Sequence, residues 1–219
     1  MTSATPPVNT DAWLPAQWAE YLELSRSLAL AKAHCYFDSG WMRLEMSPLG
    51  ALPARENSIV STLVALFTTL KGLRMVELTN PTIRKTGLRD AQPDIAFYLG
   101  RAFTLPPWNN QPIDTDRCGA PQLVIEIAST TLDDDLGRKR LLYERLDSQE
   151  YWVVNVQVAQ VIAFTIANGG STQISTSQVL PGLAIATVEE ALTRSQSEDD
   201  GTINRWLMAT FTAPEEAES

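Results

Sequence analysis

Hydrophobic and polar residues alternate along this chain with two periods, one typical of helices and one typical of strands. Steps of three and four residues place Val60, Leu63, Phe67 and Leu70 on one stripe of a predicted helix. The other helical stretches are predicted over residues 15–30, 133–146, 187–195 and 199–211, beside this one over 53–71. Strands are predicted at 33–38, 41–46, 74–79, 82–85, 89–99, 121–128, 151–156, 161–166 and 173–175.

The apolar run from Leu123 to Ala128 is typical of a central strand that is covered on both faces. One carboxylate, Glu126, lies inside this run. An ionised carboxylate in a dry sheet is strongly destabilising unless a cation or hydrogen-bond donors meet it. The pattern therefore predicts a polar partner for Glu126.

Three other residues are candidates to lie beside Glu126. Asp94 opens a predicted strand directly after Pro93, where it could equally be a turn residue. Lys139 lies on the core-facing stripe of the helix over 133–146, from which it could reach Glu126 or extend to solvent. Glu56 continues the stripe of the helix over 53–71 and is either buried or a solvated first-turn residue.

Asp94 and Glu126 on adjacent antiparallel strands would lie about 5 Å apart. Two carboxylates at that distance repel and favour a cation, and hard oxygen ligands suit Mg²⁺, with Mn²⁺ as a substitute. Such an ion can acidify water and stabilise charge on a phosphate, and a nearby lysine can assist. The constellation therefore predicts phosphodiester hydrolysis.

Charge and composition narrow the function classes. The net charge of -9 opposes tight non-specific binding to nucleic acid. Basic residues nevertheless cluster in segments 71–89 and 138–145, so nucleic-acid contacts are expected there, and the candidates are Arg84, Lys85, Arg89 and Arg138. Cys35 and Cys118 are too far apart in sequence to suggest zinc, and His34 is expected to be a packed or surface residue. No membrane partner is predicted, and we expect a cytoplasmic location.

Four short stretches, taken together, resemble one known family. They are Gln92-Pro93-Asp94-Ile95, the run from Leu123 to Ser129, the run from Gly137 to Tyr143, and the run from Glu150 to Val154. The chain is similar in these stretches to the Uma2-like family, also called DUF820, which belongs to the PD-(D/E)xK nuclease superfamily and is abundant in cyanobacteria. The similarity extends from about Trp13 to Trp206.

The resemblance implies an α+β fold of the restriction-endonuclease type, with a central mixed β-sheet flanked by helices. It implies one domain over 13–211, with a disordered segment 1–12 and an acidic tail over 212–219. Asp94 and Glu126 would be catalytic metal ligands, with Lys139 and Glu56 as further catalytic residues. The lysine departs from the superfamily pattern, because position 128, two residues after Glu126, is alanine.

The function implied is a Mg²⁺-dependent endonuclease that acts on nucleic acid, with DNA as the expected substrate, and family analogy favours a homodimer. Two alternatives stay open at this point. The first is a catalytically inactive binding or assembly module with the same fold, which the net charge and the displaced lysine favour. The second is a small-molecule phosphoesterase, for which the sequence has no matching motif.

Overall fold

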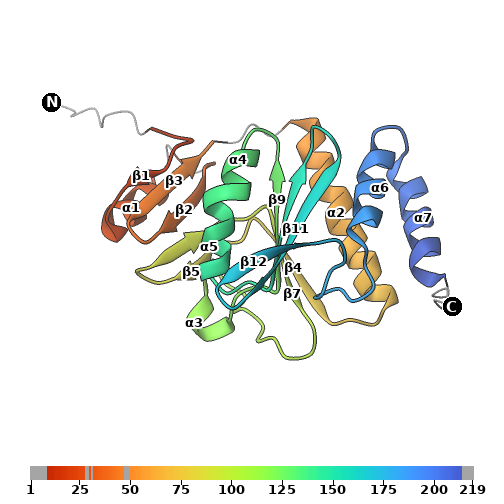
Figure 1. Cartoon of the computed structure of the whole chain (residues 1–219). Coiled ribbons are helices and arrows are strands. Elements are labelled where there is room, and N and C mark those ends of the chain that lie inside the picture. The colour runs from red at the N-terminus through yellow and green to blue at the C-terminus, as the bar shows by residue number, and fades with distance from the viewer. Residues whose placement is uncertain (1–8, 28–29, 31, 47–49, 214–219) are drawn as a thin grey trace.

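The computed structural model describes residues 9–27, 30, 32–46 and 50–213. Its strands form two mixed sheets of six strands each, with the helices packed around them (Figure 1). This confirms the α+β class and a mixed sheet flanked by helices. A second six-stranded sheet was not predicted, although its hairpin over 33–46 and its strands within 82–85 and 89–99 were, because the sequence does not show which strands pair.

The strands of five or more residues that begin after residue 70 in the chain form the sheet that carries Glu126. Its order is β12-β11-β10-β9-β7-β4. The bounds are β4 Met75–Thr79, β7 Ile95–Leu99, β9 Leu123–Ala128, β10 Glu150–Asn155, β11 Gln160–Ala167 and β12 Gly170–Ile174. Strand β9 is interior, because it pairs in parallel with β10 and antiparallel with β7. This confirms the predicted central strand.

The other sheet is built mostly from the N-terminal part of the chain, with order β1-β3-β2-β6-β5-β8. Its strands are β1 Leu14–Pro15, β2 His34–Asp38, β3 Trp41–Glu45, β5 Ile83–Lys85, β6 Arg89–Ala91 and β8 Ile113–Asp114. Strands β2 and β3 form the predicted hairpin, with the turn at Ser39 and Gly40. Both turn residues have positive φ, which glycine adopts readily.

Helices cover the two faces of the sheet that carries Glu126. Helices α2 (Ala51–Leu70), α6 (Ile185–Ser195) and α7 (Asp200–Thr212) pack together on one side (Figure 1). The opposite face meets a helix of three parts, namely α4 (Leu132–Asp134), the π-helical turn η2 (Asp135–Lys139) and α5 (Arg140–Arg145). The remaining helices are α1 (Trp18–Ser25), beside the N-terminal sheet, and α3 (Thr115–Cys118).

Alternation along β9 separates the two cores. Leu123 and Ile125 pack in the core beneath α2, α6 and α7, whereas Val124 and Ala128 pack in the core beneath α5. Because side chains alternate along a strand, Glu126 points to the α5 side. The polar partner that its burial requires must therefore come from α5, from η2 or from the N-terminal sheet.

Some predicted elements were wrong at their bounds. The strand over 89–99 is two strands, because the chain leaves one sheet after β6 and enters the other at β7. The helix over 15–30 is shorter, since Pro15 pairs with Trp41 and α1 ends at Ser25. Part of that prediction, at residues 28 and 29, lies outside the described residues.

Three further details differ from the sequence expectation. Helix α6 starts at Ile185, two residues before the predicted start at 187. Leu70, placed on the buried stripe of α2, is exposed. Within the segment 1–12, expected to be disordered, Asp11 is held by a hydrogen bond of 2.8 Å from its N–H to the Leu44 carbonyl; residues 1–8 lie outside the described residues.

In the part of the chain that the structure describes, we find no helix with the length and apolar character that crossing a bilayer requires.

Candidate functional site

Asp94 and Glu126 lie at the same end of two neighbouring strands. The antiparallel register pairs Ile95 with Ile125 and Ala96 with Val124, and one further step places Asp94 opposite Glu126. Both side chains therefore belong to the same face of the sheet. The backbone N–H of Ile127 donates a hydrogen bond of 2.6 Å to Asp94 Oδ2, which fixes the orientation of this carboxylate.

The two carboxylates line a cavity of about 190 Å³. Its wall is completed by the N-terminal part of α2, by Asn80 after β4, and by the segment after β9 (lining residues Glu45, Pro53, Ala54, Asn57, Asn80, Asp94, Glu126, Ile127, Ser129, Thr130 and Thr131). Asp94 is partly exposed, with 26% of its side chain accessible, whereas Glu126 is only 2% exposed although it lines the same cavity. Access at Asp94 is what a hydrolytic site requires and what a sealed salt link would lack.

Glu126 is held by two tyrosines. Tyr143 of α5 donates a hydrogen bond of 2.7 Å to Glu126 Oε1, and Tyr36 of β2 donates one of 3.2 Å to the same oxygen. Burial raises the pKa of Glu126 well above its ordinary value, and the nearby charge of Asp94 adds to this, whereas Lys139 lowers it. Burial also raises the pKa of Asp94, partly offset by the Ile127 hydrogen bond. A cation at this place would favour the ionised form of both groups.

Lys139 lies behind the carboxylates. Its Nζ is 2.8 Å from Asp135, 3.0 Å from Glu45 and 3.8 Å from Glu126, and the side chain is only 1% exposed. Burial alone would lower the pKa of Lys139, but the three carboxylates raise it above its ordinary value. Lys139 is not among the described residues that line the cavity. It therefore balances charge inside the protein and positions Glu126.

A π-helical turn brings Lys139 to this position. Asp135 and Lys139 are the first and last residues of η2, and both are buried. π-Helical turns are often found at functional sites, since the wider turn changes the direction of the side chains. Asp133, Asp134 and Asp135 form a run of acids that is typical of a helix N-terminus, but the Asp135 side chain points inward to Lys139.

Glu45 is a site residue that the sequence analysis missed. It ends β3, lines the cavity, and is bound by Lys139 and by Arg43, whose Nε lies 2.9 Å from Glu45 Oε2. Burial raises the pKa of Glu45, but the charges of Lys139 and Arg43 prevail and lower it below its ordinary value. The alternating hairpin pattern predicts the strand but not the far segment that packs on it, so no local signal identifies Glu45.

Glu56 is buried away from the described lining of the cavity, whereas His34 lies close to Asp94. Glu56 is fully buried on α2, which settles the open alternative in favour of an inward side chain. Among the described residues neither of its carboxylate oxygens has a hydrogen-bond partner, and burial raises its pKa to about 7. It is not one of the described residues that line the cavity. His34 Nδ1 lies 3.9 Å from Asp94 Oδ1, a proximity that the sequence analysis did not foresee.

The four basic candidates for nucleic-acid contacts are engaged within the protein. Arg84 pairs with Asp90, Lys85 Nζ is 3.9 Å from Asp116, and Arg89 Nε is 3.2 Å from Asp38. Arg138 lies over the rings of Trp13 and Trp41. Arg84 also lines a cavity of about 900 Å³, and Arg138 lines one of about 220 Å³. A role for these residues in binding nucleic acid stays a prediction.

The donor set at the cavity fits Mg²⁺. Within the described ranges, no group of three or more His, Cys, Asp and Glu side chains has the geometry of a metal site. Asp94 and Glu126 alone would supply two protein carboxylates. Mg²⁺ is commonly held by one or two carboxylates, with water and substrate phosphate as its other ligands. The residues present are thus compatible with Mg²⁺ that binds together with substrate.

Comparisons with known proteins agree with this fold. Residues 18–202 match the family model of Uma2, described as "Putative restriction endonuclease". A crystal structure from Anabaena variabilis ATCC 29413, described as "a putative nuclease belonging to DUF820", is similar with a TM-score of 0.53 and 17% sequence identity. The similarity covers 81% of this chain and 99% of that one. No curated protein matches the chain.

Proposed function

The chain belongs to the Uma2 family of restriction-endonuclease-like proteins, and from this premise we propose that it is a Mg²⁺-dependent endonuclease that hydrolyses phosphodiester bonds in DNA. The observation that carries the proposal is the pair Asp94 and Glu126, opposed on one sheet face and open to a cavity. Burial raises the pKa of both carboxyl groups, and a bound cation would favour their ionised forms.

Each residue of the site has a role that follows from its contacts. When bound to Asp94 and Glu126, Mg²⁺ would acidify a water molecule and stabilise the negative charge on the phosphate. The Ile127 N–H holds Asp94, and Tyr143 and Tyr36 hold Glu126, so the ligands are ordered before substrate arrives. Lys139 neutralises part of the carboxylate charge and so limits the repulsion of an incoming phosphate.

A nicking assay tests this function. With Mg²⁺ or Mn²⁺, wild-type protein is expected to nick supercoiled plasmid, and Asp94→Asn and Glu126→Gln are each expected to lower the rate by about 100-fold or more. Both substitutions keep the side-chain size but remove the charge that holds the ion. Manganese binding, followed by electron paramagnetic resonance, is expected to weaken in the same variants.

Asp116→Asn is the matched control, since Asp116 is exposed and pairs only with Lys85 at 3.9 Å. It is expected to nick as fast as wild type. Equal nicking by all three variants would identify a contaminating nuclease and remove the support for the proposal.

A second candidate is a nuclease fold without catalysis that serves as a binding module. The observation that favours it is the burial of Lys139, which is held by Asp135 and Glu45 and is not among the described residues that line the cavity. This reading predicts no metal-dependent nicking by wild type and no manganese binding lost on Glu126→Gln. The same two measurements therefore decide between the candidates.

A further inference from the structure

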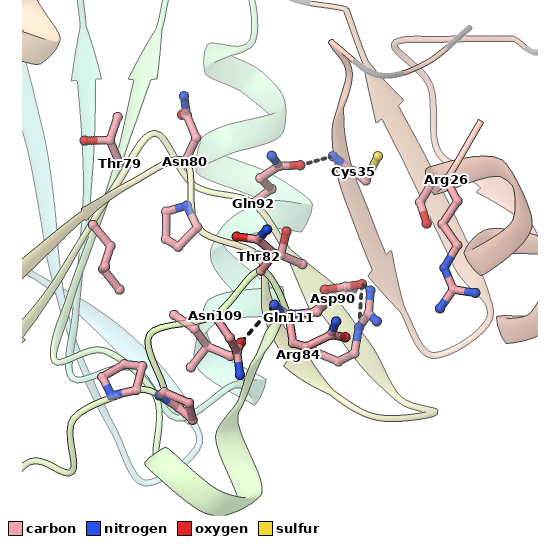
Figure 2. Close-up of a pocket in the computed structure, with 18 of the residues that line it drawn as sticks. Arg26, Cys35, Thr79, Asn80, Thr82, Arg84, Asp90, Gln92, Asn109 and Gln111 are labelled. Atoms are coloured by element: carbon pink, nitrogen blue, oxygen red, sulfur yellow. Dashed lines mark hydrogen bonds and ion pairs between the residues drawn. The ribbon is translucent and has the colours of Figure 1, made fainter. Parts of the chain in front are cut away.

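A second and larger cavity shares the lining residue Asn80 with the cavity at the carboxylates, and the proposed mechanism does not use it. Its volume is about 900 Å³. It is bounded by the end of α1, by the segment from Leu78 to Thr82, and by the segment from Pro106 to Ile113. Figure 2 shows Arg26 on one side of this cavity and Asn80, Thr82, Gln92, Asn109 and Gln111 on the other. The size suits one or two small polar groups and not a double helix.

Unused amide groups are the main feature of its wall. Asn80, Asn110 and Gln111 line the cavity and are exposed, and among the described residues no hydrogen bond engages their side-chain amides, which are therefore free to meet a ligand. An amide offers one donor and one acceptor side by side, the pattern that pairs with the edge of a nucleobase. By contrast, the Gln92 amide is engaged, because its Oε1 accepts a hydrogen bond of 3.2 Å from the Cys35 N–H.

The charges at this cavity favour a neutral group over a phosphate. Arg84 and Asp90 both line it and pair with each other, so together they contribute no net charge. Arg26 is the other basic residue of the wall. A phosphate-binding site would be expected to present several unpaired cations. The wall is therefore better suited to the base of a nucleotide than to its phosphate.

An exposed tryptophan lies at the same cavity. Trp108 lines it and is 72% exposed, more than any other large hydrophobic side chain among the described residues. Pro106, Pro107 and Pro112 are in the same segment, and proline restricts the backbone that carries the indole. Exposed aromatic rings on restricted segments are the surfaces on which unpaired bases stack.

The two cavities share one residue. Asn80 lines both, and its backbone N–H donates a hydrogen bond of 3.0 Å to the Asp94 carbonyl. Because the cavities share Asn80, a strand with a phosphate at Asp94 and Glu126 would bring a neighbouring nucleotide to the larger cavity. We propose that this cavity binds an unpaired nucleobase of single-stranded nucleic acid, next to the bond that is cleaved. The substrate class in this inference rests on the proposed function.

Binding without cleavage tests the inference. In EDTA, a labelled single-stranded dA12 is expected to bind the full chain more tightly than the duplex of the same sequence, measured by fluorescence anisotropy. Trp108→Ala is expected to weaken binding of the single strand by about tenfold, the loss of one stacked base. Gln111→Ala is expected to weaken it less and to reduce the preference for dA12 over dT12, because an amide pairs with adenine.

Val158→Ala is the matched control, since Val158 is also an exposed hydrophobic residue and is not among the residues that line this cavity. It is expected to bind as wild type does. Equal binding of dA12 by wild type, Trp108→Ala and Gln111→Ala would overturn the inference, as would no binding by wild type.

The nicking assay separates the two proposals. If wild type fails to nick but binds single strands through Trp108, the base site stands and the endonuclease does not. If wild type nicks and Trp108→Ala both binds and nicks like wild type, the endonuclease stands and the base site does not.

Discussion

Lys139→Met is expected to lower the free energy of unfolding by about 3–5 kcal/mol, the usual cost of removing one partner from a buried charge network. Methionine fills a similar space but leaves Asp135 without its partner at 2.8 Å and Glu126 without its nearest cation. Glu45 is less affected, because Arg43 still binds it. Urea denaturation followed by circular dichroism would measure the loss.

A double-mutant cycle identifies the cause of this loss. Asp135→Asn removes one of the charges that Lys139 balances, so in the Lys139→Met background it is expected to restore part of the stability. Lys85→Met is the control, since Lys85 is partly exposed and 3.9 Å from Asp116, and its change is expected to stay within about 0.5 kcal/mol. A loss below about 1 kcal/mol for Lys139→Met would contradict the buried network.

Glu56→Gln is expected to stabilise the protein at pH 8 by roughly 1–3 kcal/mol and to have little effect at pH 4.5. Burial raises the pKa of Glu56 in the folded state to about 7, from an ordinary value of 4.5. Between these two values the folded state binds more protons than the unfolded state. The contribution of Glu56 to stability therefore falls as pH rises from about 4.5 to about 7, and it stays low above that range.

Thermal denaturation of wild type and Glu56→Gln across this pH range would measure the effect, because the difference between them cancels the other titrating groups. Glutamine has a polar amide that is also left without a partner, so the gain is smaller than the full pKa shift implies. Glu190→Gln, on the exposed face of α6 and paired with Arg194, should show no such pH dependence. A constant difference at every pH would mean that the pKa of Glu56 is the same in the folded and unfolded states, which would contradict the effect of burial.

The same variant tests the catalytic role predicted for Glu56. A glutamate that only occupies the core can be replaced without loss of nicking. A glutamate that acts in the reaction would lose nicking while the fold becomes more stable. The nicking rate and the free energy of unfolding are measured independently, so together they distinguish a structural Glu56 from a catalytic one.

The sequence predicted the parts of the fold that local patterns encode. The run around Glu126 has the length and continuity of a strand covered on both faces, and β9 is that strand. The stripe of α2 placed Glu56 in line with the buried face but left its direction open, and the structure shows it buried. The stripe over 133–146 likewise left two directions open for Lys139, which is buried.

Contacts between distant segments were not predictable from one chain. Glu45, Tyr36 and Arg43 reach the site from a hairpin about 80 residues before Glu126, and alternation predicts the strand without showing what packs on it. The break between β6 and β7 was missed because the residues on both sides have an extended pattern. Pro93 was the available signal, since proline interrupts pairing within a sheet.

The chain passes from one sheet to the other between Ala91 and Ile95, and this passage carries Gln92 at the larger cavity and Asp94 at the smaller one. A ligand that moves residues 92–94 must therefore change both cavities at once. Thermodynamic reciprocity then requires that filling either cavity change the affinity of the other by the same factor. Binding of a base in the larger cavity and cleavage at the smaller one would in that case be coupled through the backbone of residues 92–94.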